Sequence, residues 1–194
     1  ASSTGLITTK TLVSHDAKEL TGFAEGLGGE VVVKVVCSRI FQENHLSWGI
    51  YTNKVSAEAL REHENDVALA PLMAQEYIPK KFELRITVVG SKIFACAIYS
   101  QNSKKTKDDW RHYDFDNVPH EPYELPEEIK NKLLQFMKKA GLSFGAIDMV
   151  VRPDGEFVFL EVNPSGQFSW IESLTKLPIS EAIAETLANP PIGN

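Results

Sequence analysis

Apolar residues recur at helical spacing in four segments of this chain. The clearest segment lies between Glu127 and Ala140, where apolar positions three and four residues apart form a stripe and Gly141 follows as a terminator. Before the first segment, Ser14 or Asp16 is placed to act as an N-cap, and a glycine pair ends it. The pattern predicts helices over residues 16–27, 56–65, 127–140 and 180–187.

Between these helices, runs of β-branched and aromatic residues broken by Gly, Pro and Asp indicate strands. Phe82–Val89 and Ile93–Ser100 flank a short glycine-containing turn, which predicts a hairpin. The other predicted strands are 30–36, 48–55, 74–78, 146–151 and 156–162. This mixed order of helices and strands predicts an α+β fold.

One long stretch, Gln101–Leu125, is polar, charged and punctuated by prolines. A loop of this length is uncommon inside a compact domain unless it has a function. The sequence therefore predicts a mobile flap over a functional site.

Size and charge narrow the class of protein. A chain of 194 residues with 43% hydrophobic residues suits one medium domain or two small lobes. The net charge of -6 and the pI near 5.4 argue against a nucleic-acid partner, because phosphate binding needs a basic patch. No apolar run approaches the roughly 20 residues that span a bilayer, so we expect no membrane partner.

Both cysteines, Cys37 and Cys96, lie in apolar stretches, where a thiol usually behaves as a small buried hydrophobe. This placement favours a core role over a redox or metal role. We expect a soluble protein of a reducing compartment, the cytoplasm.

Acidic side chains interrupt two strands that the pattern predicts to be buried. Asp148 lies in the first strand, and Glu161 and Asn163 stand two apart in the second, so both point to one face. If Asp154-Gly155 forms a two-residue hairpin loop, Asp148 lies opposite Glu161. Three oxygen ligands then surround one point. This is how a protein holds an Mg²⁺ ion that also binds a substrate phosphate.

A simpler interpretation exists for each of these residues. A three-residue loop would shift the parity and put the two acids on opposite faces. Taken one at a time, Asp148 would cap a turn, Glu161 would pair with a lysine, and Asn163 would begin an ordinary Asn-Pro turn. Taken together, the three residues favour the metal site.

Polar residues elsewhere suit a bound nucleotide. Lys34 stands in the middle of a buried strand. Its ammonium group either extends to water at the edge of the sheet or binds an anion such as a phosphate. The run Gln75, Glu76, Tyr77, Ile78 leaves a strand just before a proline. Its backbone groups at Glu76 and Ile78 are candidates to pair with an adenine edge, and an ordinary strand end is the alternative.

Two arginines are candidates to contact the reacting phosphate or carboxylate groups. Glu83 and Arg85 share one face of a predicted strand, where Arg85 is suited to a phosphate or carboxylate and Glu83 to ribose hydroxyls. Surface alternation explains this pair equally well. Arg111, in Asp109-Trp110-Arg111, is placed to reach a transferring phosphoryl group when a flap closes, or it is a solvated loop charge.

In combination, these motifs resemble ATP-grasp enzymes. The motifs are Val-Val-Val-Lys34, the stretch Gln-Glu-Tyr-Ile-Pro-Lys-Lys-Phe-Glu-Leu-Arg-Ile-Thr-Val-Val-Gly, the Asp-Trp-Arg loop and Leu-Glu-Val-Asn-Pro-Ser-Gly-Gln. They are most similar to the RimK-related group and, within it, to the microviridin-type (graspetide) peptide ligases. The resemblance runs from about Leu6 to Leu187.

The resemblance implies a role for each candidate residue. Arg85 would contact the phosphate or acyl phosphate, and Arg111 would be the second catalytic arginine. Lys34 would bind ATP phosphates and Glu83 the ribose. The adenine would lie against Gln75, Glu76, Tyr77 and Ile78, and magnesium would be held by Asp148, Glu161 and Asn163.

The reaction implied is an ADP-forming ligation, in which a carboxylate becomes an acyl phosphate that an amine or hydroxyl then attacks. The expected substrate is a peptide or a small carboxylate, with the leader of a precursor peptide and a second copy of the chain as further expected partners. A RimK-like amino-acid ligase, an ATP-grasp kinase and a non-catalytic nucleotide-binding module are the alternatives.

The family architecture implies two α+β lobes with the nucleotide site in the cleft between them. Residues 1–78 would form the small lobe and residues 79–194 the large lobe with the magnesium site. Members also have a preceding N-terminal domain and an upstream phosphate-contacting lysine, which this sequence lacks, since Lys10 is not a match. The segment from Cys37 to Trp48 lacks the family's glycines, and Lys176 stands where relatives often end a helix with glycine.

Overall fold

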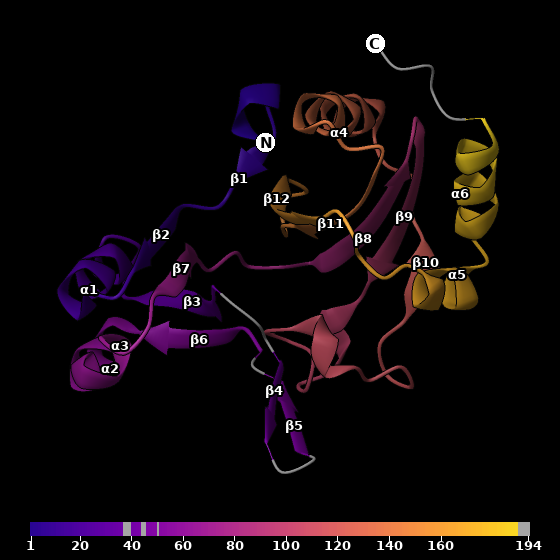
Figure 1. Ribbon diagram of the computed structural model, residues 1–194. Helices are drawn as coiled ribbons and strands as arrows, with labels where there is room; N and C mark the ends of the chain where they lie inside the picture. The colour runs from indigo at the N-terminus through magenta and orange to yellow at the C-terminus, as the bar shows by residue number, and fades with distance from the viewer. Residues whose placement is uncertain (37–39, 44–45, 50, 190–194) are drawn as a thin grey trace. The chain divides into compact units, whose positions relative to one another are not determined.

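The computed structural model describes residues 1–36, 40–43, 46–49 and 51–189 of the chain. They divide into two compact units (Figure 1). The first unit comprises residues 1–8, 79–103 and 114–194, and the second comprises residues 9–78 and 104–113.

A six-stranded sheet forms the centre of the first unit, in the order β1-β12-β11-β8-β9-β10. Neighbouring strands are antiparallel except β1, which runs parallel to β12. The strands are β1 (Ile7–Thr8), β8 (Phe82–Val89), β9 (Lys92–Ile98), β10 (His120–Pro122), β11 (Phe144–Val151) and β12 (Phe157–Asn163). The helices are α4 (Glu127–Ala140), α5 (Ser169–Thr175) and α6 (Ile179–Ala188), with the 3-10 helices η1 (Ser2–Thr4) and η2 (Ser100–Asn102).

Period-two alternation in the central strands gives this sheet one apolar face. Leu84 and Ile86 of β8 and Ile147 and Met149 of β11 join a buried cluster that includes Leu133 of α4. Helix α4 therefore packs on this face, as its sequence stripe predicts (Figure 1). Helices α5 and α6 lie on the opposite side of the sheet (Figure 1).

The second unit is built on a four-stranded antiparallel sheet in the order β2-β7-β3-β6. Its strands are β2 (Thr11–Ser14), β3 (Glu30–Val35), β6 (Asn53–Ser56) and β7 (Leu72–Glu76), with a separate hairpin of β4 (Ile40–Glu43) and β5 (Leu46–Gly49). Its helices are α1 (Ala17–Glu25), α2 (Ala57–Glu62), α3 (Glu64–Val67) and the 3-10 helix η3 (Trp110–His112). All three α-helices contribute to one buried cluster with Val31 and Ala74.

Most predicted helices and strands are confirmed to within a few residues. Helix α4 has the predicted bounds, and Asp16 caps α1 by accepting the backbone N–H of Lys18 at 2.7 Å. The predicted strand 48–55 is wrong as a single element. Its first part belongs to β5, which pairs with β4, and its second part is β6, which pairs with β3.

Helix α5 and the short strands β1, β2 and β10 were not predicted from the sequence. Helix α5 has only seven residues, its N-cap Phe168 makes no side-chain hydrogen bond, and it ends at Lys176 instead of a glycine. The strands are two to four residues long, too short for a periodic pattern.

The polar stretch 101–125 is more ordered than a mobile flap. It holds η3 and β10, and Thr106, Asp109 and Trp110 are buried. Hydrogen bonds made by Asp109 fix part of the stretch to the second unit, as described below.

The expected division of the chain after residue 78 coincides with a limit of the two units. Residues 1–8 nevertheless group with the first unit, because β1 pairs with β12, and residues 104–113 group with the second. Within the described residues, no helix is both long and apolar enough to cross a membrane.

Candidate functional site

The face of the six-stranded sheet opposite α4 carries a row of polar side chains. On β8 the alternation that buries Leu84 and Ile86 under α4 turns Glu83 and Arg85 to this other face. The register then places Arg85 beside Asp148 on β11, and Asp148 beside Glu161 on β12. Three neighbouring strands thus bring together Arg85, Asp148 and Glu161, while Lys34, the other predicted phosphate contact, belongs to the second unit.

The hairpin that joins β11 to β12 differs from the predicted two-residue loop. Val151 pairs with Phe157, and the Arg152 N–H donates to the Glu156 carbonyl at 2.9 Å. The loop therefore has three residues, Pro153 to Gly155, and Gly155 adopts a φ of 91° that a side chain would strain. By itself, this loop would put the two acids on opposite faces.

A β-bulge restores the pairing of the two acids. Met149 pairs with Phe159, but the next pair is Asp148 with Glu161, so Leu160 is an extra residue on β12. The bulge reverses the facing of every later residue on β12. The predicted pairing of Asp148 with Glu161 is thus confirmed, although the loop from which we predicted it is wrong.

Arg85 is held by two partners from different segments. Its Nη1 donates to both carboxylate oxygens of Asp148, at 2.9 and 3.0 Å, and its Nη2 donates to the backbone carbonyl of Gln167 at 3.1 Å. The arginine is 7% exposed and Asp148 is 8% exposed, so this ion pair is buried. The Nε of Arg85 has no hydrogen-bond partner among the described residues.

Asn163 ends β12 at the margin of the same face. Its Oδ1 accepts the backbone N–H of Ser165 at 3.0 Å, and its own carbonyl accepts the N–H of Gly166 at 3.2 Å. These bonds form the Asn-Pro turn of the simpler interpretation. The same Oδ1 also accepts the hydroxyl of Ser165 at 3.4 Å, so a metal bound to this oxygen would take the place of that longer bond.

The oxygen set of Asp148, Glu161 and Asn163 fits a magnesium ion. All three come from two paired strands, and hard oxygen donors are what Mg²⁺ takes from proteins. Across residues 1–36 and 51–189, no three His, Cys, Asp or Glu side chains form a metal-binding group, so the set depends on the Asn163 amide.

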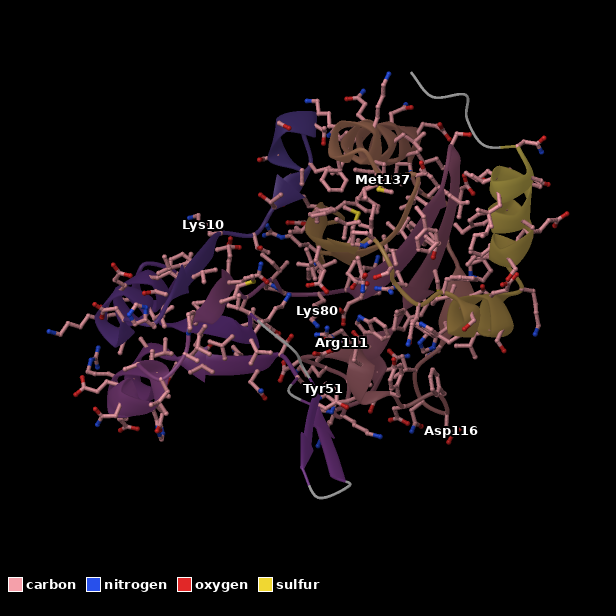
Figure 2. All side chains as sticks on the ribbon, viewed as in Figure 1. Lys10, Tyr51, Lys80, Arg111, Asp116 and Met137 are labelled. Carbon is pink, nitrogen blue, oxygen red and sulfur yellow. The ribbon has the colours of Figure 1, made fainter. Side chains whose placement is uncertain are left out.

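Glu83 belongs to a buried polar cluster on the same strand as Arg85. Its Oε1 accepts the ammonium of Lys80 at 2.9 Å and the hydroxyl of Ser100 at 2.8 Å. The side chains of Lys80 and Glu83 are 8% and 7% exposed. Lys80 (Figure 2) was not among the predicted site residues, although it stands three residues before Glu83 at the start of a buried strand.

Cys96 lies beside Arg85 on β9 and is fully buried, as predicted. Burial raises the pKa of its thiol to about 12. Cys37 and most of the glycine-poor segment between Cys37 and Trp48 lie outside the residues whose side chains the structure describes.

In the second unit, the sheet face away from α1 and α2 carries Lys34 and Gln75. Val31 and Val33 pack toward the helices, so Lys34 points to the other face, where it is half-buried opposite Met73 of β7. Gln75 is buried and donates from Nε2 to the hydroxyls of Thr9 and Thr11, at 3.2 and 3.0 Å.

The strand end that we predict to contact adenine is partly engaged within the unit. The backbone N–H of Glu76 donates to the carbonyl of Lys10 at 2.9 Å. Next to it, Lys54 lies 4.6 Å from the ring centre of Tyr77 and makes a 2.6 Å ion pair with Glu30. The hydrogen bond to Glu30 raises the pKa of Lys54.

The Arg111 side chain is 22% exposed and is held by hydrogen bonds within its own unit. Its Nε donates to Oδ1 of Asp109 at 2.7 Å, and its Nη2 donates to Oδ2 of Asp109 and to the hydroxyl of Thr52. The backbone N–H of Thr52 also donates to Asp109 at 3.0 Å. Beside this cluster the ring of Tyr51 stacks on His112 at 3.9 Å (Figure 2), so the Asp-Trp-Arg loop is fixed to its own unit.

Comparison with known proteins identifies the class. The sequence pattern of the RimK-like ATP-grasp domain matches residues 3–187. The fold is an α+β ATP-grasp fold, and the chain belongs to the RimK-like ATP-grasp family. No curated protein matches the sequence.

Solved structures of peptide-modifying enzymes are similar to this chain. A Chryseobacterium gregarium RiPP-associated ATP-grasp ligase, in complex with ADP and a leader and core peptide, is 32% identical, with a TM-score of 0.88 over 98% of this chain and 57% of its own. The macrocyclase MdnC of Microcystis aeruginosa, bound with precursor peptide MdnA, is 36% identical, with a TM-score of 0.82 over 98% and 57%. The macrocyclase MdnB of the same organism is 34% identical, with a TM-score of 0.72 over 97% and 56%. The chain thus spans a little over half the length of these proteins.

Proposed function

We propose that this chain is the ATP-binding part of an ADP-forming ligase that activates a carboxylate of a peptide as an acyl phosphate. The observation that carries the proposal is the row of Arg85, Asp148 and Glu161 on one sheet face of a RimK-like ATP-grasp protein. Burying a cation and acids costs desolvation free energy that the fold does not need. A role in binding or chemistry therefore explains these residues better than a role in folding.

Candidate nucleotide-binding groups are present in each unit. In the second unit, Lys34 contacts ATP phosphates, and the segment from Gln75 through Glu76, Tyr77 and Ile78 receives the adenine. The Glu76 carbonyl and the Ile78 N–H are the pairing groups, since the Glu76 N–H is engaged by Lys10. In the first unit, Glu83 receives the ribose hydroxyls, with Lys80 and Ser100 fixing its carboxylate.

Asp148, Glu161 and Asn163 are the proposed magnesium ligands. When bound, the metal would neutralise phosphate charge and orient the phosphoryl group for in-line attack. A relative of the same fold, the ATP-grasp ligase PsnB, is complexed with magnesium and ADP, at 21% identity and a TM-score of 0.72.

Arg85 and Arg111 are the proposed catalytic residues. A guanidinium stabilises charge that develops on transferring phosphoryl oxygens or on the acyl phosphate. Attack by the substrate carboxylate on the γ-phosphorus gives ADP and the acyl phosphate, and an amine or hydroxyl then displaces phosphate. The chain's part in both steps is to position groups and neutralise charge, without a protein nucleophile.

The substrate is proposed to be a precursor peptide whose own side chains supply the carboxylate and the acceptor. This proposal rests on the two relatives at 32% and 36% identity that are complexed with such peptides. Whether the acceptor is an amine or a hydroxyl sets the product as an amide or an ester.

The test uses the complete natural protein, ATP, magnesium and the peptide encoded nearest to its gene. We expect ADP release that depends on the peptide, a product lighter by one water for each bond formed, and a hydroxamate when hydroxylamine is added during turnover. A phosphorylated alcohol does not react with hydroxylamine, so ADP release without hydroxamate would replace the proposal with a kinase. Equal ADP release with and without peptide would overturn it.

Glu161→Gln and Glu156→Gln form a matched pair of variants on the β11–β12 hairpin. Glu161→Gln removes a proposed metal ligand with little change of shape, and we expect loss of turnover and weaker magnesium-dependent ATP binding by calorimetry. Glu156 pairs with Arg152 at the exposed turn, so Glu156→Gln should behave as the wild type. Equal behaviour of the two variants would remove Glu161 from the site.

A further inference from the structure

The segment after β12 turns back onto the polar face of the sheet. Asn163 accepts the N–H of Ser165 on its side chain and the N–H of Gly166 on its backbone, which makes a tight turn. Gly166 follows and is buried, although Ser165 and Gln167 on either side are exposed. The turn therefore presses one residue of the loop against the sheet.

Residue 166 has room for no side chain. A Cβ there would lie 2.4 Å from the Cβ of Ala146, 3.0 Å from Nη2 of Arg85 and 3.2 Å from the carbonyl oxygen of Asn163. Ala146 is the register partner of Asn163 on β11, and its Cβ is attached to the backbone, so it cannot move aside. Of these three nearest atoms, only the Arg85 Nη2 belongs to a flexible side chain.

The close approach of Gly166 to Ala146 places the next residue of the loop beside Arg85. The carbonyl of Gln167, one residue after Gly166, accepts the Nη2 of Arg85 at 3.1 Å, while Nη1 is bonded to Asp148. The guanidinium thus has one fixed end on the sheet and one on the loop. The loop can supply its carbonyl only if residue 166 lies flat on Ala146.

We infer that Gly166 is a positioning residue, whose missing side chain sets the orientation of Arg85 in the site. The inference rests on the proposed function for its catalytic consequence, and on the contacts alone for its structural one. Gly166 touches neither substrate nor nucleotide in this scheme and acts through Arg85.

The first test is Gly166→Ala and its rescue by Ala146→Gly. In the complete protein we expect Gly166→Ala to lower kcat by about a hundredfold, the effect of a misplacement near 1 Å, while ADP affinity measured without magnesium stays near the wild-type value. Ala146→Gly removes the atom at 2.4 Å, so the double variant should regain most of the loss. Wild-type turnover in Gly166→Ala, or no rescue, overturns the inference.

The second test needs no turnover. Urea unfolding midpoints are measured for Gly166→Ala, Arg85→Lys and their combination. If Gly166 acts through Arg85, the alanine should cost less in the Arg85→Lys background than in the wild type, because the bond it disturbs is already weakened. Additive effects would overturn the inference.

Gly145→Ala is the matched control. Gly145 is the neighbour of Ala146 on β11, but a Cβ there would meet Met137 and Val162, both at 3.0 Å, on the α4 side of the sheet. Its effect should add to that of Arg85→Lys. If the wild type proves inactive on peptides while the unfolding cycle shows coupling, the proposed function fails and the positioning role stands.

Discussion

The two faces of the six-stranded sheet differ in chemistry, although the same strands form both. One face is apolar and closely packed, and the other is polar and hydrogen-bonded. Toward α4, Leu84, Ile86, Ile147 and Met149 are nearly inaccessible and need no particular partner. On the other face, the buried Arg85 is held by an ion pair to Asp148 and a hydrogen bond to Gln167, while its Nε has no partner among the described residues.

The two faces therefore contribute differently to the stability of the fold. Apolar packing stabilises in proportion to the area that it removes from water. A buried ion pair roughly breaks even at best, because desolvation offsets its attraction. The polar face is therefore explained by chemistry more readily than by folding, and the first two predictions test this contrast.

Asp148→Ala should give the largest effect. It leaves the Arg85 guanidinium buried without its carboxylate, and we expect the free energy of unfolding to fall by about 3–5 kcal/mol, measured by urea denaturation. Replacing the pair together, with Arg85→Met and Asp148→Leu, should recover most of this stability but no activity. A loss well under about 1 kcal/mol for Asp148→Ala would mean that water reaches the pair freely.

Leu133→Ala tests the apolar face. Leu133 is fully buried against the sheet, so the cavity should lower the free energy of unfolding by about 2–5 kcal/mol. At a temperature where the variant is folded, its turnover and magnesium dependence should match those of the wild type. A change in magnesium dependence would show that the two faces are coupled, which would break the comparison.

Lys176→Gly should stabilise the protein. Lys176 ends α5, one of the two helices on the polar side, and its φ is 61°. This left-handed conformation is unfavourable for any residue that has a Cβ. Allowing for the flexibility of glycine in the unfolded chain, we expect a gain of about 0.5–1 kcal/mol by thermal unfolding. Lys176→Ala keeps the strain and should show no such gain, and a gain of equal size there would rule out this explanation.

Deleting Leu160 should have the smallest effect. Without the bulge, Glu161 follows Phe159 directly and still pairs with Asp148, so both faces keep their residues. We expect the free energy of unfolding to change by about 1 kcal/mol or less, and cross-strand NMR contacts to retain the Asp148–Glu161 pair. Deleting Val158 also removes the bulge and keeps the Asp148–Glu161 pair, but it moves Phe159 from the α4 face to the polar face, so it should lower the free energy of unfolding by more than deletion of Leu160 does.

Strong local patterns explain what could be predicted. The apolar stripe of 127–140 gave α4 its bounds, and Asp16 and Ser56 act as N-caps. Short elements such as β1 and α5 carry too few residues for a pattern, and pairing with distant strands decides them. Residues 101–125 look like a free loop until Asp109 is seen bonded to Thr52, 57 positions earlier.

The chemical groups of the site, and the shared face of Glu161 and Asn163, follow from the sequence alone, because side-chain alternation along a strand is local. The pairing of Asp148 with Glu161 follows from the fold instead, because a three-residue loop and a bulge at Leu160 offset one another. The fold also decides the partners of Arg85, since its bond to Gln167 depends on a loop that reaches it only where residue 166 has no side chain. Pairing and close approach join residues distant along the chain, and no local pattern encodes them.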